Sequence, residues 1–115
     1  MKKILLILVL LLFSSIAFAQ KSPCKEDICV VQFNAGWNSA NDVEWMDKLG
    51  DCGIKYIDIA EDAEAQALYE IVVVPTIIVF NGKEVKRFQA DISFAMKATR
   101  KEVQEVIDEI IMSDF

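Results

Sequence analysis

The chain has 115 residues, a formal net charge of -6 and no histidine, and this length predicts one domain. Because a negatively charged chain repels phosphate backbones and anionic lipid surfaces, we expect no nucleic acid and no membrane surface among its partners. The lack of histidine excludes a Ser–His–Asp triad and removes the commonest metal ligand, so we expect neither a metal nor another cofactor.

Residues 1–19 have the pattern of a secretory signal peptide. Lys2-Lys3 gives a basic start, residues 4–13 are apolar, and Ala17-Phe18-Ala19 is a small-x-small cleavage signal before Gln20. The apolar stretch is short for a membrane span, and no stop-transfer pattern follows it. We therefore expect cleavage between Ala19 and Gln20, a periplasmic or secreted product, and no membrane attachment after cleavage.

The cysteines are Cys24, Cys29 and Cys52, and in an oxidising compartment they are expected to form disulfides. Their number is odd, so at least one is free or pairs with another chain. No two have Cys-x-x-Cys spacing, and no zinc-binding quartet is present. Because the first predicted helix returns the chain to the edge where the first predicted strand starts, we expect a disulfide from Cys52 to either Cys24 or Cys29.

The folded domain is expected over residues 28–115, after a polar N-terminal tail at residues 20–27. An apolar, β-branched run predicts a first strand over residues 28–35 that is buried on both faces. Asn38 then stands where a helix needs its N-cap, and the helix itself is predicted over residues 39–50. Its apolar face consists of Val43, Met46 and Leu49.

Three strands, a short helix and a turn follow. Residues 54–59 predict a second strand, the Ala-rich stretch 62–71 a short helix, and residues 72–80 a central strand entered through a proline. Asn81-Gly82 is a hairpin signal, so residues 83–89 are expected to return as an antiparallel edge strand.

The last predicted element is a long helix. Thr99-Arg100-Lys101-Glu102 matches a capping box at its start, and apolar residues then recur at helical spacing from Val103 to Ile111. The resulting order, β-α-β-α-β-β-α, indicates an α/β fold.

Four segments along the chain are similar to those of the thioredoxin family. They are the strand Val31 to Trp37, the lead-in Tyr69-Glu70-Ile71, the triplet Val74-Pro75-Thr76, and the turn Phe80-Asn81-Gly82 with Glu84-Val85 after it. Over about residues 28–112, the resemblance implies a minimal thioredoxin-like fold, in which a central mixed four-stranded sheet carries helices on both faces. It also implies a cis peptide bond between Val74 and Pro75.

The resemblance also shows what the chain lacks. Where the family has Cys-Gly-Pro-Cys, this chain has Asn38-Ser39-Ala40-Asn41, and Gln32 stands at the position of the family's buried proton-relay acid. An amide side chain supplies no ionisable nucleophile for thiol–disulfide exchange. We therefore expect no catalytic residue. The resemblance implies instead a domain that has lost redox activity and binds a protein or extended peptide in a groove beside Trp37, Val74 and Pro75.

Two rival functions stay open. The first is a thiol–disulfide oxidoreductase that uses Cys24, Cys29 or Cys52 in place of the missing pair. The second is a structural or oligomeric module, because the segment Phe88–Met96 alternates apolar and other side chains. An edge strand offers unpaired backbone groups to another chain, so the partner expected in that case is a second copy, bound through this edge.

Overall fold

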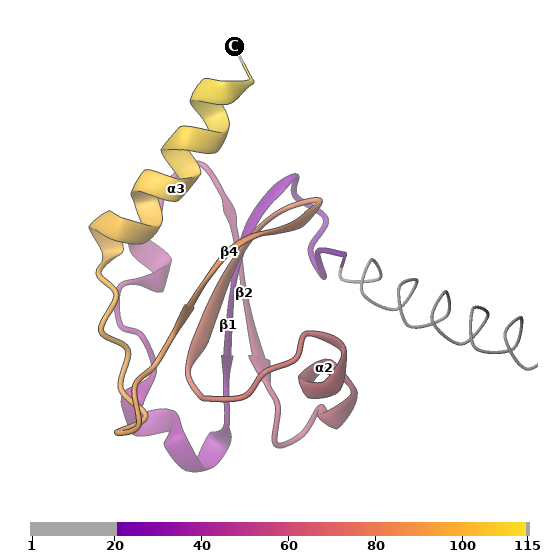
Figure 1. The fold of residues 1–115 in the computed structure, drawn as a ribbon, viewed down its shortest axis with the longest axis vertical. Helices are drawn as coiled ribbons and strands as arrows, with labels where there is room; N and C mark the ends of the chain where they lie inside the picture. The colour runs from indigo at the N-terminus through magenta and orange to yellow at the C-terminus, as the bar shows by residue number, and fades with distance from the viewer. Residues whose placement is uncertain (1–20, 115) are drawn as a thin grey trace, which may run out of the picture.

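The computed structural model describes residues 21–114. The predicted signal peptide and its cleavage site before Gln20 lie outside the described residues. No helix between residues 21 and 114 is long and apolar enough to cross a membrane. The elements in chain order (Figure 1) are β1 (Ile28–Asn34), the 3₁₀ helices η1 (Gly36–Asn41) and η2 (Met46–Lys48), β2 (Gly53–Asp58), α2 (Ala63–Leu68), β3 (Thr76–Asn81), β4 (Lys83–Gln89) and α3 (Arg100–Ser113).

The strands form one mixed sheet in the order β2-β1-β3-β4. β1 pairs in parallel with β2 and antiparallel with β3, and β3 pairs antiparallel with β4. β1 is therefore hydrogen-bonded along both edges, and every residue from Cys29 to Asn34 is buried. This mixed four-stranded sheet confirms the predicted fold class.

Helices cover both faces of the sheet, with α2 on one side and α3 on the other (Figure 1). Because successive residues of a strand point to opposite faces, β1 sends Cys29, Val31 and Phe33 toward the α2 side and Val30 toward the α3 side. The buried stripe of α3 consists of Val103, Val106, Ile107 and Ile110.

The predicted strands and the last helix are confirmed, with small shifts at their ends. β3 starts only at Thr76, because residues 73–75 form a bend that contains the expected cis Val74–Pro75 bond. Thr99 caps α3 as the capping-box motif predicts, since its Oγ1 accepts the N–H of Glu102 at 3.2 Å.

The α-helix predicted over residues 39–50 is wrong. Two short 3₁₀ helices occupy this stretch, and Asp42 between them leaves the helical region, with φ -55° and ψ 141°. The cause is a side chain of β1, because the Oε1 of Gln32 accepts the N–H of Val43 at 2.7 Å. In an α-helix that N–H would bind the carbonyl of Ser39, so Gln32 interrupts helical hydrogen bonding after η1.

The alternating segment Phe88–Met96 is a strand only as far as Gln89. The chain then turns, and Phe94 adopts a positive φ of 62°. Ile92 is 96% exposed, whereas Met96 packs against the core on the α3 side. Pairing of this segment with a second copy of the chain stays a prediction.

Removing the cap of α3 should destabilise the protein. We expect Thr99→Ala to lower the free energy of unfolding by about 1 kcal/mol, because the N–H of Glu102 loses its side-chain acceptor. Thr99→Ser keeps the hydroxyl and should lose less. Urea unfolding followed by circular dichroism measures both variants, and equal losses would show that the hydroxyl does not cap the helix.

Candidate functional site

Where the family has its cysteine pair, this chain has a network of amides at the end of β1. Asn38 is buried in η1, and its Nδ2 donates to the Oδ1 of Asn34 at 3.1 Å. Asn41 donates in turn to the Oδ1 of Asn38 at 2.8 Å. The Oδ1 of Asp42 accepts from Asn34 at 2.6 Å and from Gln32 at 3.1 Å. The amides thus bind one another and a single carboxylate.

Asn38 also connects this network to two distant loops. Its Nδ2 lies 3.4 Å from the carbonyl oxygen of Val74 and 3.2 Å from that of Phe94. The predicted N-cap role of Asn38 is wrong, because Ala35 stands at the N-cap of η1 and the Asn38 side chain reaches the loops instead. Asn38 therefore holds the bend before β3 and the segment after β4 against η1.

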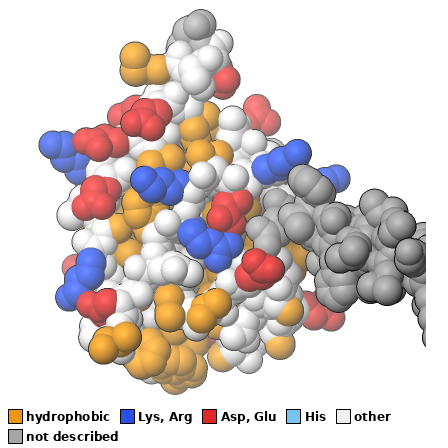
Figure 2. Space-filling model, viewed as in Figure 1, with side chains coloured by type: hydrophobic (Ala, Val, Ile, Leu, Met, Phe, Trp, Pro, Cys, Tyr) orange, Lys and Arg blue, Asp and Glu red, His pale blue; other side chains and the backbone are white. Residues whose placement is uncertain are grey.

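The residues predicted to line a binding groove differ in exposure. Trp37 is 68% exposed and meets Phe94 edge-on, with ring centroids 5.5 Å apart. Hydrophobic side chains gather at this end of the molecule (Figure 2). Val74 and Pro75 are buried, and the carbonyl of Val74 already has a donor in Asn38. The accessible part of this region is aromatic surface.

Gln32 has a structural role at the family's relay position. It is buried, and its amide bonds Asp42 at one end and Val43 at the other. In residues 21–114, no buried side-chain nitrogen or oxygen lacks a hydrogen-bond partner. The amide network is therefore fully paired within the chain, which favours a stabilising role over a chemical one.

A sulfur pair lies at the opposite end of β1. Cys24 and Cys29 form a disulfide, with Cα atoms 6.2 Å apart. Cys29 is fully buried in the core on the α2 side, whereas Cys24 lies in the turn before β1 and is partly exposed. At about 3.3 Å per residue, the strand separates Cys29 from Asn34 by about 17 Å. The disulfide is thus remote from the amide network.

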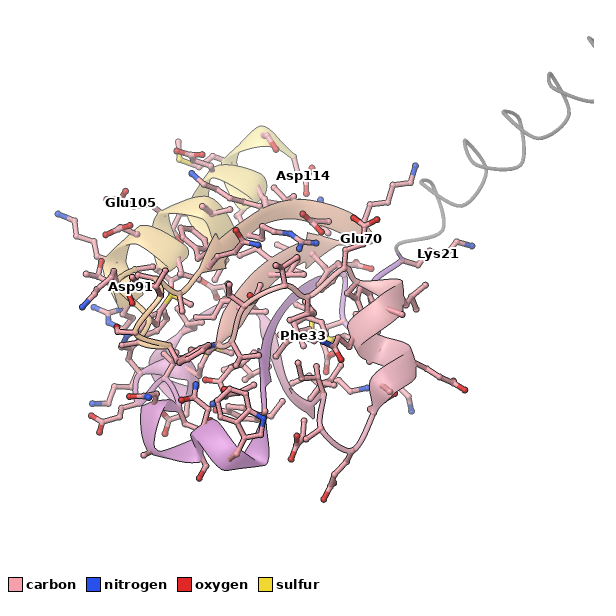
Figure 3. The ribbon with its side chains drawn as sticks, turned by 60° about the horizontal axis from the view of Figure 1, so that its bottom comes forward. Lys21, Phe33, Glu70, Asp91, Glu105 and Asp114 are labelled. Carbon is pink, nitrogen blue, oxygen red and sulfur yellow. A yellow bond between two sulfur atoms is a disulfide. The ribbon has the colours of Figure 1, made fainter. Side chains whose placement is uncertain are left out.

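The segment before β1 is fixed by hydrogen bonds that do not depend on the disulfide. The N–H of Ser22 donates to the carbonyl of Gly82 at 3.0 Å, and the N–H of Gly82 donates to the carbonyl of Asp27 at 3.2 Å. The hydroxyl of Tyr69 donates to the carbonyl of Lys21 at 3.1 Å. Figure 3 shows Lys21 on the side of the molecule that α2 occupies. Reduction of the disulfide would therefore leave the turn in place.

The disulfide predicted for Cys52 is wrong, because Cys24 pairs with Cys29 and Cys52 has a free thiol. Gly53 is the register partner of Cys29, so Cys52 does lie near the start of β1 as expected. However, Cys52 packs against the core on the α3 side, while the other two cysteines lie on the α2 side. Because neighbouring positions along a strand point to opposite faces of the sheet, a difference of one residue in register determines on which face a cysteine lies.

Glu26, which was not predicted as a site residue, lies beside the disulfide. The ligating atoms of Cys24, Glu26 and Cys29 all lie within 4.8 Å of one another. Within the described residues, 21–114, no other three cysteine or acidic side chains are grouped in this way. The spacing Cys-x-Glu-x-x-Cys was the available signal, because a disulfide between its ends must fold the intervening turn back on itself.

No protein-family model and no curated protein matches the chain. Solved structures match its fold. A thioredoxin mutant from Halobacterium salinarum has a TM-score of 0.58 and 20% identity, over 72% of this chain and 74% of that one. A reduced thioredoxin pre-protein from Schistosoma mansoni has a TM-score of 0.56 and 22% identity, over 85% and 88%. Thioredoxin-2 of the malaria parasite, a component of its protein secretion machinery, has a TM-score of 0.56 and 16% identity, over 75% and 85%. These matches establish a thioredoxin-like fold.

The prediction of a binding domain that has lost redox activity is wrong. The thioredoxin-like fold carries a disulfide between Cys24 and Cys29. The prediction rested on the family's own position, Asn38 to Asn41, whereas the disulfide lies in the turn before β1. A redox reaction at Cys24 and Cys29, the first of the two rival functions, agrees better with these findings.

The amide network should contribute substantially to stability. We expect Asn38→Ala to lower the free energy of unfolding by about 2–3 kcal/mol, because the buried carbonyl of Val74 and the partly buried carbonyl of Phe94 lose their donor. Asn41→Ala is the matched control at an exposed amide, and it should cost less than about 1 kcal/mol. Urea unfolding of both variants measures the difference. Similar losses would contradict the central position of Asn38.

The free thiol should react slowly at neutral pH. Burial, and to a smaller extent the negative charge of Asp51, raise the pKa of Cys52 above its ordinary value. Because the thiolate is the reactive form, alkylation of Cys52 should rise at a higher pH in the folded than in the urea-unfolded protein. Asp51→Asn should shift the pH dependence of Cys52 alkylation only partway toward that of the unfolded protein, since the thiol stays buried. Mass spectrometry of iodoacetamide-treated protein measures the rates, and coincident folded and unfolded profiles would contradict this account.

Proposed function

We propose that this protein is a thiol–disulfide oxidoreductase whose redox pair is Cys24 and Cys29. The supporting observation is their unequal burial, with Cys29 fully buried and Cys24 partly exposed. A reagent from solvent reaches Cys24 more easily than Cys29. This inequality suits a pair in which Cys24 exchanges with the partner and Cys29 resolves the mixed disulfide.

The reaction in the reducing direction has two exchange steps. The Cys24 thiolate attacks one sulfur of a partner disulfide, and the partner's other sulfur leaves as a thiolate that takes up a proton. The Cys29 thiolate then attacks the Sγ of Cys24, the Cys24–Cys29 bond forms, and the partner leaves with both thiols reduced. Two electrons pass to the partner, and a dithiol reductant regenerates the pair by the same steps in reverse.

Two side chains of opposite charge, Lys55 and Glu26, lie near the turn that carries Cys24. The Nζ of Lys55 donates to the carbonyl of Pro23 at 3.2 Å, directly before Cys24 in the chain. A nearby positive charge stabilises a thiolate relative to a thiol. The Glu26 carboxylate, within 4.8 Å of both sulfurs, acts in the opposite direction. The proposed role of Cys24 therefore rests on its exposure and not on these charges.

The disulfide is a weak candidate for a purely structural role. It joins residues only 5 positions apart, and closing so short a loop contributes about 2 kcal/mol in the chain-entropy model. The flanking backbone is already held by its hydrogen bonds to Gly82 and Tyr69. Opening the disulfide should therefore leave the turn largely ordered, and the two sulfurs should stay close enough to form the bond again.

The partner that suits this reaction is an exported protein with a disulfide or a dithiol. The signal-peptide pattern of residues 1–19 supports activity in the periplasm or outside the cell. Substrate disulfides persist in such oxidising compartments.

Turnover with cysteine variants tests the proposal. The protein should accelerate reduction of insulin disulfides by dithiothreitol, and Cys24→Ser should bring the rate to background. Reduced Cys29→Ser protein, mixed with insulin after dithiothreitol has been removed, should accumulate a mixed disulfide at Cys24, because no resolving thiol remains. Cys52→Ser is the matched control and should keep the activity of the parent.

Two results would overturn the proposal. The first is a folded parent protein that gives no acceleration. The second is activity that survives Cys24→Ser and disappears with Cys52→Ser.

A further inference from the structure

Glu26 completes a cluster of three potential metal ligands with the redox pair. The Sγ atoms of Cys24 and Cys29 and a carboxylate oxygen of Glu26 lie within 4.8 Å of one another. Thiolates bind soft and borderline metals, and a carboxylate is a common third ligand of zinc. While the disulfide is closed, its sulfurs are not thiolates, so the cluster can bind a metal only after reduction.

A glycine makes room for the Glu26 side chain. Gly53, at the start of β2, is the register partner of Cys29. A Cβ atom at residue 53 would lie 2.5 Å from the Oε2 of Glu26 and 2.6 Å from its Cδ. The carboxylate therefore lies directly over the α-carbon of Gly53, beside the strand that holds Cys29. Almost any other residue at position 53 would push Glu26 aside.

We propose that reduction of the Cys24–Cys29 disulfide creates a zinc site made of the two thiolates and the Glu26 carboxylate. The inference rests on the reducibility of this disulfide, which the proposed function also requires. A dithiol or phosphine reductant opens the sulfur–sulfur bond and is itself oxidised. Zn²⁺ then displaces the two thiol protons and takes three protein ligands, with water in the fourth position.

The spacing of the cluster fits zinc once the sulfurs separate. With zinc–sulfur bonds of about 2.3 Å, two tetrahedral thiolate ligands stand about 3.8 Å apart. Reduction lets the bonded sulfurs move apart to this separation, while Glu26, whose side chain is exposed and extended over Gly53, closes in. The partly exposed Cys24 lets the ion enter from solvent, and the buried Cys29 binds it from the core side.

The carboxylate distinguishes zinc from other metals. Cu(I) prefers soft thiolate and thioether ligands, so binding through the two thiolates alone would leave Glu26 without a role. Magnesium and calcium prefer oxygen ligands and would not use the thiolates. A dithiolate with one carboxylate and an open fourth position suits Zn²⁺ best. Such binding would also hold both thiols as thiolates bound to metal and so withhold them from exchange.

Metal titration of the reduced protein tests the proposal without any turnover assay. In a Cys52→Ser background, phosphine-reduced protein kept free of oxygen should bind one Zn²⁺ per chain, and Co²⁺ should give thiolate-to-metal charge-transfer absorption. The disulfide form should bind neither ion. Glu26→Gln should weaken zinc binding at least about tenfold through loss of one ligand. Asp27→Asn is the matched control, an exposed acid outside the cluster, and should change little.

Gly53→Ala gives a second variant that keeps the carboxylate but displaces it, and it should also weaken zinc binding. The proposal is overturned if the reduced protein binds no zinc, or if Glu26→Gln binds it as tightly as the parent. Zinc binding without catalytic turnover would refute the proposed function alone. Turnover without zinc binding would refute this inference alone.

Discussion

The burial of β1 on both faces is the constraint on which the rest of the structure depends. Because α2 covers one face of the sheet and α3 the other, each side chain of this strand must enter one of two cores. Because side chains alternate between the two faces along β1, Cys29 lies on the α2 side and Gln32 points toward Asp42 and Val43. The same alternation separates Cys52 from the Cys24–Cys29 disulfide, although its neighbour Gly53 pairs in register with Cys29. One strand thus determines the position of both the disulfide and the amide network.

The two ends of β1 carry different groups, an amide network at the C-terminal end and a disulfide at the N-terminal end. At the C-terminal end, where thioredoxins have cysteines, Asn38 uses its amide to bind two loops and Gln32 interrupts the helix. Such a network stabilises a particular loop arrangement, because every buried polar atom in it has a partner. At the N-terminal end, a short turn held by its own hydrogen bonds carries a disulfide with one partly exposed cysteine. The proposed redox reaction therefore involves Cys24, in a segment that the sequence pattern predicts only as an N-terminal tail.

Local signals were sufficient for the elements whose cause is local. Apolar runs predicted the strands, and the Thr99 motif predicted the start of α3. The helix over residues 39–50 was wrong because its hydrogen bonds are taken by a side chain from another element, Gln32, which periodicity cannot reveal. The cysteine pairing failed for a related reason. Proximity to the start of β1 was predictable, whereas the face on which Cys52 lies depends on strand register.

The reduction potential of the Cys24–Cys29 pair tests the central claim most directly. Protein with Cys52 replaced by serine is equilibrated in glutathione or dithiothreitol buffers, and the oxidised fraction is measured by alkylation and mass spectrometry. A pair that exchanges with partner proteins should have a potential above about -300 mV, within the range of about -270 to -120 mV shown by thiol–disulfide oxidoreductases. A potential below about -300 mV is that of a structural disulfide, and it would contradict the account.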